Sequence, residues 1–403
     1  MTDKIISKPV EDSEGENRDH KFGYCEVKGW RNTQEDALAW EVLASDLFQN
    51  SSPAQIGNRI WTAYQNLSDH LFELFKIDAG MQEQGTTAST TVMFGDYIVT
   101  ATLADTVAFA AIYDADGRVV KVHRLNERIH TPISEQERIT ARGGFICQRR
   151  VFGTLAVSRA IGDYEISQSR IDDKGKVRDS LLGEAPIIAP DADIDIWSLA
   201  SVPKQYKVQI ITTCDGFTES ATSRKIDHAK YLMNFLNKMN NNHPGQLSES
   251  DIAKQLVSDA LEDHSKDNIS VSVQTKSANF TGMTGIYDGH GGTKCSHYVA
   301  DNIGAELTRL LMLNEAQYEQ EKNSVTNRRN DYERDNGECR NIFHDLGRDL
   351  PSPVADSSGA KYGSAGDPTF LAYKAPGQGE RKGNDLEDNE TNKPGGNSPG
   401  TSS

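Results

Sequence analysis

Five carboxylates in this chain stand where a strand-like run meets a turn, and this placement constrains the fold most. Asp36 precedes "ALAW", Asp105 follows "IVTATLA", Asp215 follows "IITTC", Asp267 precedes "NISVSV", and Asp288 follows "TGIY". A single aspartate at such a place is ordinary turn chemistry, because its side chain hydrogen-bonds the local backbone. If these strands are neighbours in sheets, however, their ends bring four or more acids to one rim.

Such a rim needs positive charge, because carboxylates held about 4 Å apart cannot all stay ionised cheaply. Mg²⁺ and Mn²⁺ prefer carboxylate, carbonyl and water oxygens, and a site that keeps several waters is suited to hydrolysis. Gly216 and Gly289 each follow one of the acids, and glycine lets a backbone carbonyl approach closely enough to become a ligand. The sequence lacks the His/Cys groupings that are typical of zinc sites.

The overall charge restricts the partners. The chain has 403 residues, a formal net charge of -16, 36% hydrophobic residues and a mean hydropathy of -0.60. Nucleic acids and anionic membranes need a basic footprint, so we expect neither as a partner. An acidic protein can still bind an anionic substrate when divalent cations stand between the two.

The beginning of the chain and its cysteines bear on the compartment. The first 21 residues are polar and acidic, and no run approaches the roughly 18 apolar residues of a membrane span. The five cysteines are scattered, without CxxC spacing: Cys25, Cys147, Cys214, Cys295 and Cys339. This pattern indicates free thiols in a reducing compartment. We therefore expect a cytoplasmic protein, with delivery by a secretion system that needs no cleaved signal left open.

Changes in composition divide the chain. We expect a disordered arm over 1–20, a catalytic domain over 21–313, a charged helical or linker extension over 314–350, and a disordered tail over 351–403. Within the domain, strand runs rich in Thr, Val and Ile alternate with long helices over 52–77 and 293–314. A shorter helix over 250–264 has Ser250 as its expected N-cap. The mixture predicts an α+β fold, a sheet core packed by helices.

Seven motifs now make the chain resemble a known family, the metal-dependent serine/threonine protein phosphatases of type 2C. The resemblance covers most of residues 22–310. The motifs, in chain order, are "GWRNTQED", "GTTAST", "RRVFGTLAVSRAIGD", "APIIAPDADI", "IITTCDGFTES", "KDNISVSV" and "YDGHGG". The resemblance implies a β-sandwich of two antiparallel sheets flanked by helices.

The order of the motifs departs from that family. The "DGHGG" strand and its helix usually follow the Glu-Asp strand within a few tens of residues, but here Asp288 follows Asp36 by 252 residues (288 − 36). We hypothesise rearranged connectivity, in which the "TGIYD" strand enters its usual place in the sheet through the linker "KSANFTGM". Eight linker residues can span about 27 Å. A position of Asp288 remote from Asp36 and Asp215 would disprove this.

The resemblance also implies roles for the acids. Asp288 would bridge two Mg²⁺ or Mn²⁺ ions, Asp215 and Asp267 would hold one of them, and Glu35 with the Gly289 carbonyl would help to hold the other. Asp36 would orient the attacking water. Asp105 and Glu219 are candidates for a weaker third ion, although both can equally be solvated loop acids.

Two further side chains suit the chemistry of a phosphate ester. Arg31 offers a planar fork for two phosphate oxygens, and its alternative is a surface ion pair with Glu35. His290 can protonate the leaving oxygen, since its pKa is near working pH, whereas a lone histidine in a turn is usually structural. Asp163 and Arg159 are expected to be structural.

Two segments match the family only in part. The usual "GDS" after the central strand is "LADT" here, which keeps Asp105 but loses the glycine. The "DHKP"-like stretch is represented loosely by "NERIHTP". These differences concern the third ion and the shape of the nearby loop.

The leading interpretation is a monomeric phosphatase that hydrolyses phosphoserine and phosphothreonine in phosphoprotein substrates through a dinuclear Mg/Mn-activated water. One alternative is a catalytically inactive phosphatase-like binding module, and another is a phosphatase of small molecules. Inactive relatives tend to lose metal acids, whereas this chain keeps Glu35, Asp36, Asp215, Asp267 and Asp288. The physiological substrate is beyond the sequence.

Overall fold

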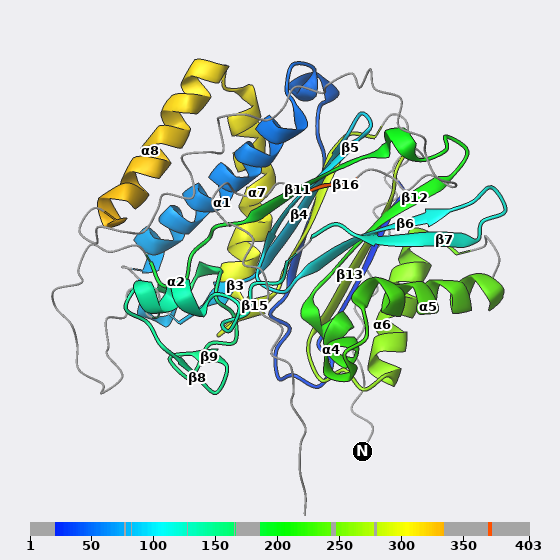
Figure 1. The fold of residues 1–403 in the computed structure, drawn as a ribbon, viewed down its shortest axis with the longest axis horizontal. Coiled ribbons are helices and arrows are strands. Elements are labelled where there is room, and N and C mark those ends of the chain that lie inside the picture. The colour runs from blue at the N-terminus through cyan, green and yellow to red at the C-terminus, as the bar shows by residue number, and fades with distance from the viewer. Residues whose placement is uncertain are drawn as a thin grey trace, which may run out of the picture.

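Two antiparallel β-sheets, packed face to face, form the centre of the protein, and helices cover their outer faces (Figure 1). The computed structural model describes residues 21–75, 78–81, 83–126, 128–164, 166, 186–242, 247–277, 280–333 and 370–372. The expected arm over 1–20 and nearly all of the tail over 351–403 lie outside these residues. Within them, the expected α+β sandwich is confirmed.

The first sheet has the strand order β1-β13-β12-β6-β7, and every pair is antiparallel. Its strands are β1 (Phe22–Val27), β6 (Val107–Tyr113), β7 (Val119–Arg124), β12 (Lys207–Thr213) and β13 (Ile269–Thr275). The ends of β12 and β13 that carry Asp215 and Asp267 are adjacent, because Thr213 pairs with Val271.

The second sheet has the order β16-β11-β5-β4-β14-β2. Its strands are β2 (Ala37–Val42), β4 (Ala88–Phe94), β5 (Tyr97–Leu103), β11 (Asp193–Ser198), β14 (Gly282–Tyr287) and β16 (Phe370–Ala372). The late strand β14 lies between two early ones, with Tyr287 opposite Ala37 and Ile286 opposite Ser89. Ala37 and Tyr287, 250 positions apart in sequence (287 − 37), are thereby neighbours at the sheet end.

Alternation along the strands sorts side chains into three apolar layers. In β6, Phe109 and Ala111 pack under the helices of the first sheet, while Ala108 and Ala110 face the second sheet. Met93 and Ile98 meet them from the other side of the interface. Successive residues of a strand point to opposite faces, so strands buried on both faces carry continuous apolar or Thr-rich runs.

Helices α1 (Pro53–Phe75) and α7 (Lys294–Met312) cover the second sheet. Their apolar faces, including Ile60 and Leu67 of α1 and Ile303 of α7, are fully or almost fully buried. Both helices lie within one or two residues of the ranges predicted from helical periodicity, which confirms those predictions. A further helix, α8 (Glu315–Glu333), packs on α1 through Tyr318.

Helices α4 (Asp215–Arg224), α5 (His228–Asn242) and α6 (Glu249–Glu262) cover the first sheet. The predicted Ser250 cap is wrong, because Ser248 is the N-cap of α6 and Asp251 completes a reciprocal capping box with it. The spacing Ser-x-x-Asp satisfies two free backbone N–H groups at once, whereas Ser250 lies inside the first turn and is buried.

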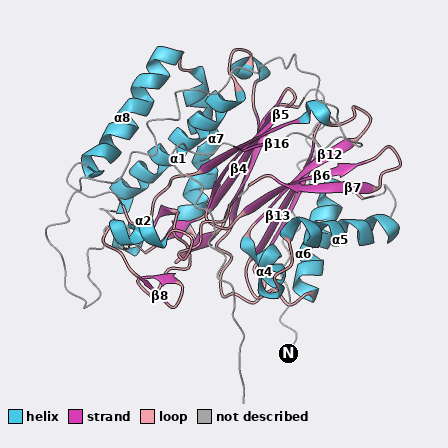
Figure 2. Ribbon diagram, in the orientation of Figure 1, coloured by secondary structure: helices cyan, strands magenta, loops and turns pink. Residues whose placement is uncertain are grey.

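Short strands and helices complete the fold, and helix α2 (Gln136–Ala141) and strand β8 (Ile146–Cys147) lie together beside the main sheets (Figure 2). Strands β3 (Gly85–Thr86), β10 (Ile161–Gly162) and β15 (Gly289–His290) form a small sheet in the order β10-β3-β15. The remaining elements are α2 (Gln136–Ala141), β8 (Ile146–Cys147), β9 (Arg150–Val151), and the 3₁₀ helices Ser45–Phe48, Ala79–Met81 and Leu199–Ser201. Among the helices that the structure describes, none is both long enough and apolar enough to cross a bilayer.

Candidate active site

Asp36 and Asp288 lie side by side at the end of the second sheet. Asp36 directly precedes β2 and Asp288 directly follows β14, and these strands pair through Ala37 and Tyr287. A carboxylate oxygen of each lies within 4.8 Å of the other and of Cys214 Sγ. The condition for the rearranged-strand hypothesis, that Asp288 lies near Asp36, is therefore met.

The first sheet brings Asp215 and Asp267 to the same place. Asp215 begins α4 directly after β12, and Asp267 comes just before β13. The side chain of Asn268 ties the segment before β2 to this strand: its Nδ2 donates to the carbonyls of Lys28 and Thr33 at 2.8 Å each, and its Oδ1 accepts from Glu35 N–H at 3.0 Å. The two sheets are thus connected beside the acids.

The carboxyl groups affect one another's ionisation. Burial raises the pKa of Asp36 to about 6 and that of Asp105 to about 6. Burial, together with the charges of neighbouring carboxylates, also raises the pKa of Asp215 and of Asp288 well above the ordinary range. For Asp288 these neighbours are Asp36, Asp215, Asp105 and Asp267. Together with the sheet ends at which these residues lie, the effects indicate that the five acids are near one another, and we call them the acid cluster.

The donors of the cluster fit a hard divalent cation. Asp36 is 2% exposed, and Ser270 Oγ donates to its Oδ2 at 2.6 Å, but its buried Oδ1 has no hydrogen-bond partner among the described residues. A buried oxygen without a donor is costly, and a cation would satisfy it. Oxygen-rich sites of this kind suit Mg²⁺ or Mn²⁺.

Cys214 lies in the cluster but is not suited as a ligand. Burial, and then the charges of Asp36 and Asp288, raise the pKa of its thiol well above the usual value, so the thiol stays protonated. Its Sγ donates to Asn268 O at 3.4 Å and accepts from Ser270 N–H at 3.2 Å. These bonds join β12 to β13, which is a structural role.

We expect the metal-free protein to lose stability as pH rises from about 4 to above 6. Asp36 and Asp105 have pKa values of about 6 when folded, against about 3.9 in an unfolded chain. The folded state therefore binds protons more tightly, and the stability from this proton binding is lost as pH rises through the folded pKa. Asp36→Asn should raise the melting temperature in EDTA at pH 8 by several degrees.

Thermal unfolding of both proteins in EDTA at pH 5 and pH 8 measures this effect. The control is Asp116→Asn, because the Asp116 side chain is 71% exposed on a hairpin turn and should change neither value. An Asp36→Asn protein that melts below the wild type at pH 8 would contradict the expectation.

Arg31 stands at the edge of the acid cluster. Its Nη2 lies 2.6 Å from Asp267 Oδ2, and its side chain is 57% exposed. The recorded ion pair is therefore with Asp267, not with Glu35 as in the alternative considered above. Asp267 binds one nitrogen of the guanidinium, and the side chain is exposed enough to bind a ligand from solvent.

His290 contacts Asp163, a pairing that was not predicted from the sequence, where Asp163 was expected to be structural. Its Nε2 lies 2.9 and 2.8 Å from the two carboxylate oxygens of Asp163, which is 1% exposed. Burial alone would lower the pKa of His290, but the charges of Asp163, Asp105 and Glu35 raise it overall. The usable signal was the "RAIGD" segment, whose acid directly follows β10.

Gly85 allows this pair to form. In the small sheet, Gly85 pairs with His290 on one side and with Gly162 on the other. A Cβ at position 85 would lie 2.1 Å from Asp163 Oδ2 and 2.5 Å from His290 Nε2. Any side chain there would push the imidazole and the carboxylate apart.

The other predicted ligands are placed as follows. Gly289 passes so close to the second sheet that a Cβ there would lie 2.2 Å from the Glu35 carbonyl oxygen. The Glu35 side chain accepts from Thr33 Oγ1 at 2.8 Å. Glu219 accepts from Ser265 Oγ at 3.1 Å and from Lys266 N–H at 2.7 Å, so its carboxylate holds the loop that leads to Asp267.

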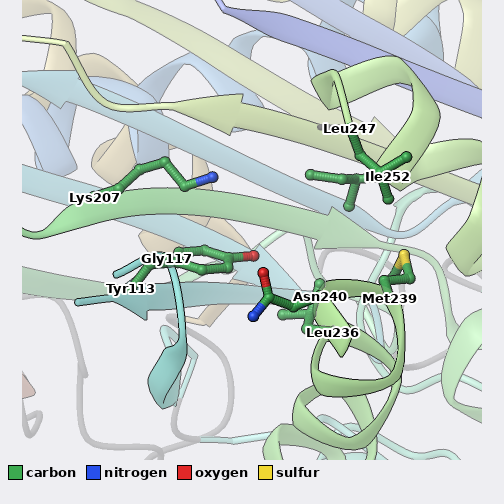
Figure 3. A pocket seen from close by; sticks show the side chains of 8 residues that line it. All are labelled: Tyr113, Gly117, Lys207, Leu236, Met239, Asn240, Leu247 and Ile252. Atoms are coloured by element: carbon green, nitrogen blue, oxygen red, sulfur yellow. The ribbon is translucent and has the colours of Figure 1, made fainter. Parts of the chain in front are cut away.

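A separate cavity of about 60 Å³ lies beside α5 (Figure 3). Its lining residues are Tyr113, Gly117, Lys207, Leu236, Met239, Asn240, Leu247 and Ile252. Lys207 Nζ lies 4.2 Å from the centre of the Tyr113 ring. The lining includes none of the clustered acids, so the cavity is not the site of their chemistry.

A helix-flanked β-sandwich with clustered acids, an arginine and a carboxylate-bound histidine at one end fits the class of metal-dependent phosphate ester hydrolases. A comparison with protein families matches residues 1–269 to protein phosphatase 2C. The chain belongs to this family and is a protein-serine/threonine phosphatase, and the family depends on divalent metal.

Two relatives matched by sequence agree with this assignment. "Probable protein phosphatase 2C 6" of Paramecium tetraurelia is 24% identical over 265 residues, which cover 55% of this chain and 80% of the relative. "Probable protein phosphatase 2C 69" of Arabidopsis thaliana is 29% identical over 222 residues, which cover 45% and 60%. A phosphatase structure from Toxoplasma gondii has a TM-score of 0.45 and 17% identity, covering 66% of this chain and 97% of its own.

The family match ends before Asp288. The position of β14 between β2 and β4 is a fact of this structure. That this strand is a relocated copy of an earlier family strand stays a hypothesis.

Proposed function

We propose that this chain hydrolyses phosphoserine and phosphothreonine in proteins with two divalent cations, Mg²⁺ or Mn²⁺, held at the acid cluster. The observation that carries the proposal is that the buried Asp36 and the half-buried Asp215 and Asp288 lie at one end of the two sheets, with carboxylate oxygens of Asp36 and Asp288 within 4.8 Å of each other. Desolvation raises the pKa of each of the three. Carboxylates in this arrangement are stable as anions only with cations between them.

Each ligand has a proposed place. Asp288 lies among the other acids and would be shared by both cations. Asp215 and Asp267, from the first sheet, would hold one cation, and Glu35 with the Gly289 carbonyl would hold the other. Asp105 would contribute to a third, weaker ion, with Glu219 as its candidate partner. When bound, the cations would lower the pKa of water and neutralise phosphate charge.

The remaining side chains act on the substrate. Arg31 binds phosphate oxygens through its exposed guanidinium. Asp36 orients the attacking water. His290 gives a proton to the leaving serine or threonine oxygen, and Asp163 keeps the ring charged and oriented by holding Nε2. This hydrogen bond leaves Nδ1 as the nitrogen that can donate to the substrate.

The binding-module alternative is less well supported. The chain retains the acids proposed to bind the two principal cations, Glu35, Asp36, Asp215, Asp267 and Asp288. The charged neighbours of His290 also keep its pKa above the ordinary value, and a docking surface has no need of such a shift. We expect phosphoproteins as substrates and a monomer in solution, which light scattering can check.

Removal of metal is expected to abolish activity reversibly. In excess EDTA, hydrolysis of a phosphothreonine peptide should fall to background, and Mn²⁺ or Mg²⁺ in excess of the chelator should restore it. The reason is that the proposed nucleophile is a water activated by the cations, so that removing them removes the attacking group. Circular dichroism in EDTA is the control for retained folding, and full activity in EDTA would contradict the proposal.

A further inference from the structure

The turn between β5 and β6 places Asp105 in the cluster with an unusual backbone. Ala104, the residue just before it, has a left-handed φ of 63° and is 0% exposed. Only glycine adopts this conformation without strain, because Cβ crowds the following carbonyl. In this chain something other than a glycine must hold the turn.

His130 forms hydrogen bonds with both the backbone N–H and the backbone carbonyl of Ala104. Its ring Nδ1 accepts a hydrogen bond from Ala104 N–H at 3.1 Å, and its own backbone N–H donates to Ala104 O at 3.0 Å. The His130 side chain is 3% exposed. Two opposed hydrogen bonds from one buried residue fix the orientation of the peptide groups on both sides of Ala104.

The His130 ring is itself held in place. Its Nε2 lies 3.0 Å from Asp193 Oδ2, and Asp193 also contacts Arg128 at 2.7 Å and Arg159 at 3.3 Å. Burial, and then the charge of Arg159, lower the pKa of His130. The ring is therefore neutral, with its proton on Nε2 and a lone pair on Nδ1 for Ala104.

Asn126 holds the other side of the same turn. Its Oδ1 accepts from Ala108 N–H at 3.2 Å, and its Nδ2 donates to Thr106 O at 3.3 Å. Asn126 and His130 thus bind residues 104–108 from two sides. The turn lies at the sheet end that carries Asp288, because Leu103 at the end of β5 is opposite Ala88, and the N–H of the preceding Thr87 donates to Asp288 O at 2.9 Å.

We infer that His130 is a positioning residue for cation binding: it keeps Ala104 left-handed and so aims the Asp105 carboxylate into the acid cluster. This inference rests on the proposed function, since it takes Asp105 as a ligand. His130 touches neither substrate nor cation and acts through the turn. A glycine at position 104 would adopt this φ without such support, because it has no Cβ.

Two substitutions separate the ring nitrogens. His130→Asn places an oxygen near the position of Nδ1 and can still accept from Ala104 N–H. His130→Gln places an amide near the position of Nε2, so it keeps a polar N–H group facing Asp193 but loses the acceptor for Ala104. Isothermal titration of the metal-free full chain with Mn²⁺ alone measures the affinity of each protein, with Asp105→Asn as the reference.

His130→Gln should weaken the Mn²⁺ site that depends on Asp105 by about 10- to 100-fold, as is usual for partners that orient a ligand. His130→Asn should stay close to the wild type. Ala104→Gly should restore most of the affinity to His130→Gln, because glycine needs no support at this φ. Adding His130→Gln to Asp105→Asn should cause no further loss.

A purely structural histidine would give a different pattern. It would lower the melting temperature in EDTA for both variants alike and leave the Mn²⁺ affinity of the folded protein unchanged. Equal losses in His130→Asn and His130→Gln, or a failure of Ala104→Gly to rescue, would overturn the inference.

A measurement on the unaltered protein covers the case in which His130→Gln does not fold. Nitrogen NMR of the imidazole must show His130 with its proton on Nε2, and a proton on Nδ1 would overturn the inference whatever the variants do. If the wild type binds no Mn²⁺, the proposed function itself fails. If the wild type binds Mn²⁺ and His130→Gln matches it, only the role of His130 fails.

Discussion

Asp288→Asn is expected to reduce phosphatase activity to the background of the assay and to remove Mn²⁺ binding at both principal sites. Asp288 interacts with Asp36, Asp215, Asp105 and Asp267, so it is the ligand that both cations would share. An amide keeps the shape of the side chain but carries no charge, and hard cations bind neutral oxygens much more weakly than carboxylates.

Activity on a phosphothreonine peptide and Mn²⁺ stoichiometry by titration measure the effect together. The melting temperature in EDTA should rise, because the substitution removes a half-buried carboxyl group whose pKa is raised by desolvation and by the neighbouring acids. Lost activity with raised stability cannot come from unfolding. Asp301→Asn, on the exposed surface of α7, is the matched control, and near-normal activity of Asp288→Asn would refute the ligand assignment.

His290→Ala is expected to lose roughly 10²–10⁴-fold in turnover, the usual contribution of a general acid, while Mn²⁺ binding survives. The loss should be smaller with p-nitrophenyl phosphate, because a phenolate leaves without being protonated. Steady-state kinetics on the peptide and on p-nitrophenyl phosphate, with Mn²⁺ saturating, make the comparison.

Asp163→Asn provides the control for this role. Asp163 is the largest of the charges that raise the pKa of His290, so its removal lowers that pKa, and the alkaline fall of the rate should move to lower pH. A histidine that served only to hold the turn would give equal losses on both substrates and an unchanged pH profile.

Much of the fold could be predicted from local patterns in the sequence. Helices α1 and α7 were predictable because apolar residues such as Ile56, Ile60 and Leu67 recur at helical spacing, and this spacing reports directly on one buried face. The N-cap of α6 was misplaced by two residues, because Ser248 and Ser250 are both good caps and only the side-chain geometry of Asp251 distinguishes them.

The residues of the candidate site could be predicted from the sequence, but most of the contacts between them could not. The acids at strand ends were visible because each interrupts an apolar run. The contact of Asp163 with His290 was not, because 127 residues separate them and they meet only through Gly85. The hydrogen bond from Ala104 N–H to His130 Nδ1 was not predictable either, because it joins residues that are 26 positions apart in sequence.

Taken alone, the order of amino acids determined the kinds of elements, the chemistry of the clustered acids and the family. Strand alternation states which face of a strand is buried, but not which strand lies beside it. The insertion of β14 between β2 and β4 was therefore decided by the tertiary structure. Only packing over long sequence distances, which no local period encodes, brings Asp288 next to Asp36 and an imidazole next to Asp163.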